Sequence, residues 1–153
     1  MPVICLTTDP DNLWNEEYGA LADGPNIDKS TSTPWFKNAT YGQKNWFPAW
    51  LEYTDENGQL QISQGVRFRI MGQYSLDMPQ KSMFIKADGQ FGESEFDYAL
   101  FDDRPYTTYK SFVLRNGGQD GLRDLKLSVF VGVDTLNDEA GGATHPRQHG
   151  DVP

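Results

Sequence analysis

The chain has 153 residues, 37% of them apolar, which is enough for one domain with a buried core. Thirteen Lys and Arg against 22 Asp and Glu give a net charge of −9, which argues against nonspecific binding to nucleic acid or to an anionic membrane. No apolar run approaches the roughly 18 residues of a membrane-spanning helix, and no basic segment followed by an apolar one opens the chain, so we expect neither a transmembrane helix nor a signal peptide.

The N-terminal part predicts one strand, one helix and a long connection. Val3–Thr7 is apolar and predicts a short strand, in which we expect the single cysteine, Cys5, to be a buried small residue rather than a reactive thiol. A short helix is expected near Asp11–Glu17, with Trp14 as its one large anchor. Residues 19–41 are rich in Gly, Pro, Ser, Thr and Asn, which predicts irregular structure.

A β-hairpin is predicted around Asp55–Gly58, because Asn-Gly readily supplies the positive φ angles of a tight turn. The hairpin joins strands at Trp46–Tyr53 and Leu60–Ile62. Further strands are expected at Val66–Met71, Ser82–Ala87 and Lys110–Arg115, with a short strand or turn at Tyr98–Phe101 and one more strand at Ser128–Val133. The predicted fold is α+β but mainly β, an antiparallel meander with one or two short helices.

The composition changes after about Leu127. Residues 134–153 are polar, small and rich in helix breakers, without apolar periodicity, so we expect a disordered or aberrant tail there. Residues 1–133 then form the folded unit, with a second short helix near Asp120–Lys126.

The candidate metal ligands have simpler explanations. His145 and His149 are four residues apart but lie in the predicted tail, so they are not expected to share a helix face. A group of acids near Arg104 is better explained by turn formation and solubility than by metal binding. These acids are Asp97, Asp102 and Asp103.

The segment GVRFRIMGQYSLDMPQKSMFIKA predicts strand, glycine loop and strand. Its first strand alternates apolar residues with Arg67 and Arg69, and we expect the two arginines to form a solvated face that pairs with acids across the sheet. Lys81 shares its parity with Met83 and Ile85, so a buried face there would require an anionic partner, such as a phosphate, for its ammonium. The alternative is a lysine with its stem on apolar neighbours and its head in water.

Six segments in order carry a resemblance to a known family: PVICLTTDPDNLW, ALADGPN, WLEYTDENGQLQISQGVRFRIMG, MPQKSMFIKA, FDYALFDDRP and YKSFVLRNGGQD. Together they resemble the CotH family, the spore-coat protein H-type kinases, whose fold is an atypical protein-kinase-like one. The resemblance covers about residues 2–124. Leu76 and Phe84 depart from the pattern, since the family often has arginine at both positions.

The resemblance implies the small, ATP-binding lobe of a bacterial Ser/Thr protein kinase, a transferase that uses ATP and Mg²⁺ and phosphorylates proteins such as spore-coat proteins. It implies nucleotide contacts from Lys81, from Gly72 and Ser75 before it, and from Arg115 and Asn116 after it. The family's catalytic and metal-binding acids lie beyond the matched segments, so we expect a truncated kinase fragment without catalytic or metal-binding residues, inactive by itself. Its expected partners are a protein substrate or the missing C-terminal lobe, and the family implies a place in the spore coat or at the cell surface.

The aromatic residues leave other functions open. Trp35, Trp46 and Trp50 lie in an aromatic-rich region, and exposed rings on a β-rich acidic protein can stack on carbohydrate. The alternative for these rings is the core of a small sheet. A sugar-binding module and a structural β module of a coat or surface protein are therefore the alternatives to a kinase lobe.

Overall fold

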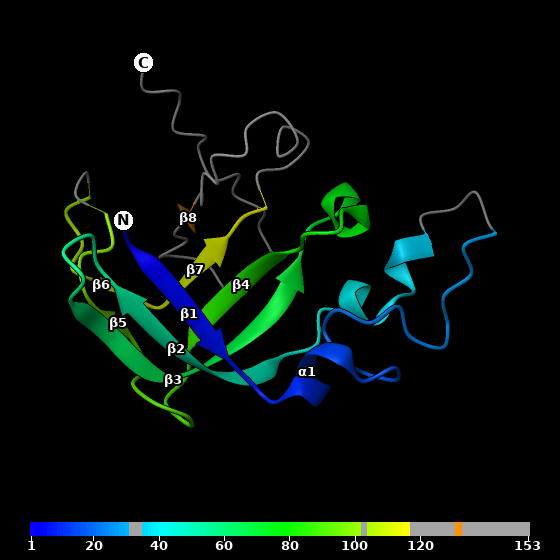
Figure 1. The fold of residues 1–153 in the computed structure, drawn as a ribbon, viewed down its shortest axis with the longest axis horizontal. Helices are drawn as coiled ribbons and strands as arrows, with labels where there is room; N and C mark the ends of the chain where they lie inside the picture. The colour runs from blue at the N-terminus through cyan, green and yellow to red at the C-terminus, as the bar shows by residue number, and fades with distance from the viewer. Residues whose placement is uncertain (31–34, 102–103, 117–130, 133–153) are drawn as a thin grey trace, which may run out of the picture.

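The computed structural model describes residues 1–30, 35–101, 104–116 and 131–132. Its main element is an antiparallel six-stranded sheet in the order β1-β2-β3-β4-β7-β8, accompanied by the two-stranded ribbon β5-β6 (Figure 1). The strands are β1 (Val3–Thr7), β2 (Phe47–Thr54), β3 (Leu60–Met71), β4 (Ser82–Ala87), β5 (Phe96–Asp97), β6 (Thr108–Tyr109), β7 (Ser111–Leu114) and β8 (Val131–Gly132). The helical elements are α1 (Pro10–Trp14) and the 3₁₀ turns η1 (Trp35–Lys37), η2 (Thr40–Gly42) and η3 (Tyr74–Asp77). The predicted α+β, mainly β fold with an antiparallel meander is confirmed.

Strand β1 lies at one end of the sheet and pairs with β2. Its residues alternate, so that Ile4 and Leu6 pack against the core while Cys5 is exposed. The prediction of a buried cysteine is therefore wrong. An apolar run in a strand with one buried face still places every second residue on the other side.

Helix α1 begins at a capping site in the sequence. The Asp9 side chain accepts a hydrogen bond from the backbone N–H of Asp11 (2.9 Å), and Pro10 occupies the first turn, where its missing N–H is not needed. The helix ends at Trp14 because Asn15 has an extended ψ of 128°. It is therefore shorter than the predicted Asp11–Glu17.

The predicted hairpin between β2 and β3 is confirmed. Gly58 has a φ of +79°, and the carboxylate of Asp55 accepts hydrogen bonds from the backbone N–H groups of Gln59 and Asn57, both at 2.9 Å. These bonds hold the pKa of Asp55 below its ordinary value, and the bond from the N–H of Gln59 has the largest effect. After the turn, β3 continues for 12 residues through Gly65, where the sequence predicts two separate strands.

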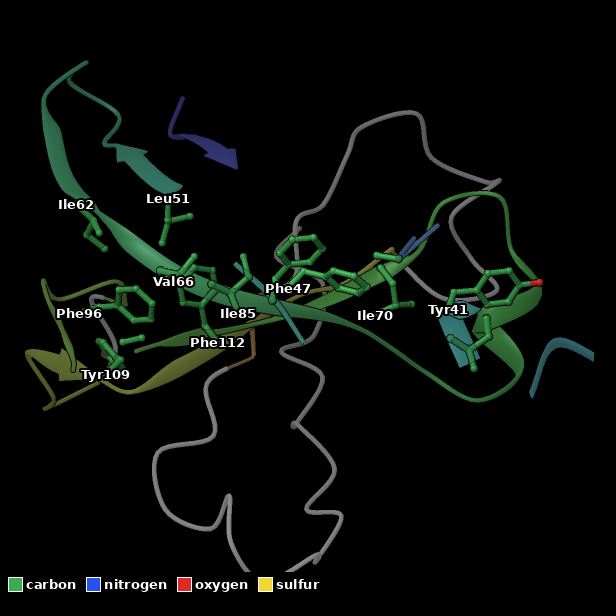
Figure 2. Close-up of a cluster of buried hydrophobic side chains, with 14 of the residues drawn as sticks. Tyr41, Phe47, Leu51, Ile62, Val66, Ile70, Ile85, Phe96, Tyr109 and Phe112 are labelled. Carbon is green, nitrogen blue, oxygen red and sulfur yellow. The ribbon is translucent and has the colours of Figure 1, made fainter. Parts of the chain in front are cut away.

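The core lies on one face of the sheet, here called the core face. It is covered by the ribbon β5-β6 and by the turns η1 and η2 (Figure 2). Burial of one large apolar side chain in this core stabilises the fold by roughly 1.5–3 kcal/mol. The strand residues with at most 1% exposure on this face are Leu51, Val66, Phe68, Ile85 and Phe112.

The opposite face, here called the outer face, carries Gly65, Arg67 and Arg69 of β3. The loop after β4 crosses this face at Gly65, since a Cβ built on Gly65 would overlap the carbonyl of Phe91. A glycine is required at this position because another backbone approaches it so closely.

Two further predictions concern the C-terminal part of the chain. The segment Tyr98–Phe101 is a turn, in which the N–H of Leu100 donates to the carbonyl of Tyr98 (2.9 Å), and β8 falls within the strand predicted at Ser128–Val133. The expected helix at Asp120–Lys126 and the expected tail at 134–153 lie outside the described residues.

Candidate functional site

A tight loop between β3 and β4 holds three of the predicted nucleotide contacts, Gly72, Ser75 and Lys81. Gly72 has a φ of +140°, a conformation that residues with a side chain rarely adopt. A Cβ on Gly72 would also overlap the Oγ of Ser75, because the chain folds back through the turn η3. The loop thus places Ser75 directly against Gly72.

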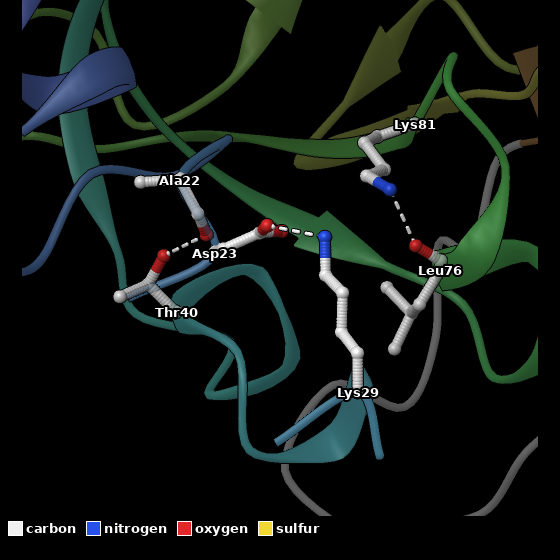
Figure 3. A network of polar contacts seen from close by, with 6 residues as sticks. All are labelled: Ala22, Asp23, Lys29, Thr40, Leu76 and Lys81. Atoms are coloured by element: carbon white, nitrogen blue, oxygen red, sulfur yellow. Dashed lines mark hydrogen bonds and ion pairs between the residues drawn. The ribbon is translucent and has the colours of Figure 1, made fainter. Parts of the chain in front are cut away.

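The ammonium of Lys81 lies partly buried against the end of this loop. It donates a hydrogen bond to the carbonyl of Leu76 (Figure 3). It donates another to the carbonyl of Met78 at 2.7 Å, and it lies 4.2 Å from the centroid of the Tyr41 ring. The sequence predicts an anionic partner for this ammonium. The direct partners are instead two neutral carbonyls and an aromatic face, which compensate its charge through dipoles and a cation–π contact.

Charged groups of the same loop and of the distant segment 23–29 act on Lys81. Burial lowers the pKa of its ammonium, while the carboxylates of Asp77 and Asp23 act to raise it. Asp23 is paired with Lys29, with 2.7 Å between carboxylate oxygen and ammonium (Figure 3). Burial, reinforced by Asp23, raises the pKa of Tyr41 to about 12, so its hydroxyl stays protonated at neutral pH.

The segment carrying Asp23 is fastened to the turn η2. The hydroxyl of Thr40 lies within hydrogen-bonding reach of the carbonyls of Gly19 (2.6 Å) and Ala22, and the N–H of Thr40 donates to the carbonyl of Asp23 (3.2 Å). Asp23, Thr40 and Tyr41 are site residues that the sequence does not single out. They lie in the long irregular connection, where no periodicity relates a residue to its neighbours in space.

Asn116 closes the same end of the sheet. Its side-chain amide donates to the carbonyl of Gln80 (2.8 Å), and its backbone N–H donates to the hydroxyl of Ser82 (3.1 Å). Asn116 is thereby bonded to the two residues that flank Lys81 in the sequence, Gln80 and Ser82. Arg115 precedes it, but no contact among the described residues joins the Arg115 side chain to Lys81. The structure therefore brings Gly72, Ser75, Lys81 and Asn116 to one end of the sheet, where Arg115 follows the end of β7 without a contact to Lys81 among the described residues.

The two arginines of β3 have different partners. Arg67 does have an acidic neighbour, with its Nε 3.1 Å from a carboxylate oxygen of Asp88. Arg69 instead faces rings, with its guanidinium 4.8 Å from the centroid of Trp46 and 5.1 Å from that of Phe84. Phe84 is the residue directly opposite Arg69 on β4. The predicted pairing with acids across the sheet is thus wrong for Arg69.

The tryptophans have different surroundings. Trp50 is 47% exposed on the outer face, and its indole N–H lies 3.2 Å from the hydroxyl of Ser63. Trp46 is half-buried and packs edge-on against Phe84, with 5.6 Å between ring centroids. The Trp35 side chain is outside the described part of the structure.

Among the described residues, no group of three or more His, Cys, Asp and Glu side chains is arranged to hold a metal ion. Asp97 ends the two-residue strand β5 and is exposed. The other acids and the histidines considered above lie outside the described residues, namely Asp102, Asp103, His145 and His149.

Comparisons of the chain with models of protein families, with curated proteins and with solved structures find no match. No helix in the described ranges has both the length and the apolar character needed to cross a membrane.

Proposed function

We propose that this chain is the nucleotide-binding small lobe of a CotH-type protein kinase, whose complete form transfers the γ-phosphoryl group of ATP to Ser or Thr hydroxyls of coat or surface proteins. One observation carries the proposal. The glycine loop, Lys81 and Asn116 converge at one end of the antiparallel sheet, and they are, apart from Arg115, the positions that the family resemblance assigns to the nucleotide.

The chemistry of this end of the sheet fits a nucleotide phosphate bound together with a divalent cation. Lys81 supplies the positive charge, and a phosphate oxygen would take the place of one of its two carbonyl acceptors. Asp23 and Asp77 act on the charge of Lys81 and would repel a bare triphosphate. A divalent cation bound to the phosphates, which the second lobe would hold in the complete kinase, would offset this repulsion.

Phosphoryl transfer also needs a base or positioning residue for the attacking hydroxyl and a fixed metal. In this proposal the second lobe supplies both, so the chain alone binds nucleotide without turnover. The measurement is Mg²⁺-dependent incorporation of labelled phosphate from ATP into a Ser/Thr acceptor protein. Incorporation by the purified chain would contradict the assignment of catalysis to a second lobe.

Nucleotide binding is tested with a fluorescent ATP analogue in the presence of Mg²⁺. We expect saturable binding that Lys81→Met weakens at least tenfold, because the substitution removes the charge while keeping the apolar stem. Lys110→Met is the control, since the Lys110 side chain is 69% exposed and lies away from the loop. Equal affinity of the wild type and Lys81→Met, or no binding by the wild type at millimolar nucleotide, would overturn the proposal.

Exposure of Trp50 favours a second candidate function, a carbohydrate-binding module. The ring is half exposed and its orientation is fixed by the hydrogen bond to Ser63, which gives a rigid apolar platform. Oligosaccharide titration should then change the tryptophan fluorescence of the wild type, and Trp50→Ala should abolish the change. A response to Mg²⁺-ATP without any response to sugars would leave the kinase-lobe proposal alone.

A further inference from the structure

Strand β1 has one edge without a neighbouring strand among the described residues. It stands first in the order β1-β2-β3-β4-β7-β8 and pairs there with β2 alone (Figure 1). In an antiparallel pair, each strand directs part of its backbone N–H and C=O groups toward its neighbour and part of them away. Within the described part of the chain, Val3–Thr7 makes no further backbone hydrogen bond. The outward groups of β1 are therefore a template on which another strand can pair.

The sequence of this edge lacks the features by which native proteins prevent such pairing. Lysine, proline or a bulge commonly protects an edge strand. The five residues VICLT contain neither a charge nor a proline, and their register with β2 runs without a shift. Valine, isoleucine and threonine also favour extended structure. The β1 edge is thus suited to pairing by its composition as well as by its position.

The alternation of β1 makes the edge self-complementary. A second copy of the chain can lie antiparallel to the first, related to it by a two-fold axis at Cys5, the central residue of the strand. On the core face, Ile4 then lies opposite Leu6 of the second copy. Both residues are only partly buried and pack against the core, so each pair extends the core face across the junction. On the outer face, Val3, which is 51% exposed, lies opposite Thr7 of the second copy.

We propose that two copies of this chain associate by antiparallel pairing of their β1 strands, with Cys5 facing Cys5 across the two-fold axis. The apolar alternation of Val3–Thr7 matches its own reverse, which favours a second copy over an unrelated strand. Five residues form a contact about 17 Å long, shorter than a stable interface requires, so the dimer dissociates on dilution. The proposal does not depend on nucleotide binding, because no residue of β1 belongs to that site.

The test changes the residues that face each other in this register. The like-charge variant combines Val3→Lys with Thr7→Lys, which sets lysine opposite lysine, and the opposite-charge variant combines Val3→Lys with Thr7→Glu. Both positions are exposed, and circular dichroism establishes that each variant is folded. The like-charge variant has the smaller net negative charge, so general repulsion between copies would favour its association, contrary to the register. Leu60→Lys is the control, since Leu60 is exposed and β2 separates it from β1.

Sedimentation equilibrium over a range of protein concentrations gives the dissociation constant of the dimer. We expect the wild type and Leu60→Lys to dimerise equally. Their dimers should be tighter at higher salt, because salt screens the repulsion between two copies that each carry a net charge of −9. The like-charge variant should dimerise at least tenfold more weakly, and the opposite-charge variant should regain the affinity of the wild type or exceed it.

Cys5 reports the register directly, because it is the single cysteine of the chain and is exposed. A short bismaleimide joins two thiols without an oxidant, and we expect it to link wild-type chains into covalent dimers. The like-charge variant keeps Cys5 but should lose this crosslinking. A wild type that stays monomeric up to millimolar concentration would overturn the proposal. So would equal affinity of the two double variants, or equal crosslinking of the wild type and the like-charge variant.

Discussion

Replacing Lys81 by methionine tests whether this lysine is anchored in the fold as the structure shows. Methionine keeps the length and the apolar stem but cannot donate a hydrogen bond. The carbonyls of Leu76 and Met78 would each lose a donor, and the Tyr41 ring would lose the ammonium that lies 4.2 Å from its centroid.

The expected change in the free energy of unfolding follows from opposing effects. A hydrogen bond to a charged group contributes about 1.5–3 kcal/mol, which favours a large loss. Burial lowers the pKa of Lys81, so the charged form is already disfavoured at this position, and the loss is smaller than the sum of its bonds. A methionine sulfur beside Tyr41 also recovers about 0.3–1.5 kcal/mol. We expect Lys81→Met to be destabilised by about 1–2 kcal/mol.

Urea unfolding at neutral pH, followed by tryptophan fluorescence, measures this difference. The control is Lys110→Met, because the exposed side chain of Lys110 has only Glu95 at 4.0 Å as its ionic neighbour among the described residues. Such a surface substitution should change the free energy of unfolding by no more than about 0.5 kcal/mol. A Lys81→Met protein as stable as the wild type, or more stable, would refute the view that the ammonium anchors the loop.

Two further perturbations address the loop over Gly65 and the phenol of Tyr41. Gly65→Ala should lower the free energy of unfolding by about 1–3 kcal/mol and speed amide exchange in residues 88–92, because its Cβ must displace the carbonyl of Phe91. Gly89→Ala, whose Cβ would meet only Ser94 at 3.9 Å, should be near neutral, and equal behaviour of both variants would contradict this reasoning. The pKa of Tyr41 is raised in the folded protein to about 12, so the stability contributed by its protonated form is complete below about pH 10 and is lost as the pH rises toward 12. The stability difference between wild type and Tyr41→Phe should therefore change across that window, and a constant difference would exclude the raised pKa.

Local sequence signals predicted the parts of the fold in which neighbours in space are also neighbours along the chain. The Asn57-Gly58 turn and the alternation of β3 lead directly to the hairpin and to the core face. The error at Cys5 arose because an apolar run does not reveal which residues of an edge strand face the core. Gly65 was expected to separate two strands, because glycine often interrupts a strand. It instead lies inside β3, where it leaves room for the crossing loop.

The proximity of the candidate residues could be predicted only where they belong to one loop or follow a neighbouring strand. Gly72, Ser75 and Lys81 belong to a single loop, and Asn116 follows a predicted strand. Asp23 and Tyr41 reach Lys81 from the irregular connection, whose path depends on hydrogen bonds such as those of Thr40 rather than on any pattern in the sequence. The carbonyl partners of the Lys81 ammonium could not be predicted for the same reason, because the sequence does not show where backbone carbonyls point.

The position of β1 at the end of the sheet has a kinetic consequence. The hairpins β2-β3 and β3-β4 close over short loops, whereas β1 must find β2 across residues 8–46. Closing a longer loop costs more chain entropy, so β1 is expected to join the sheet last and to detach first. Tyr41 and Asp23 lie within that long connection. The surroundings of Lys81 are therefore completed only in the last stage of folding, and partial detachment of β1 would loosen them while the central hairpins remain intact.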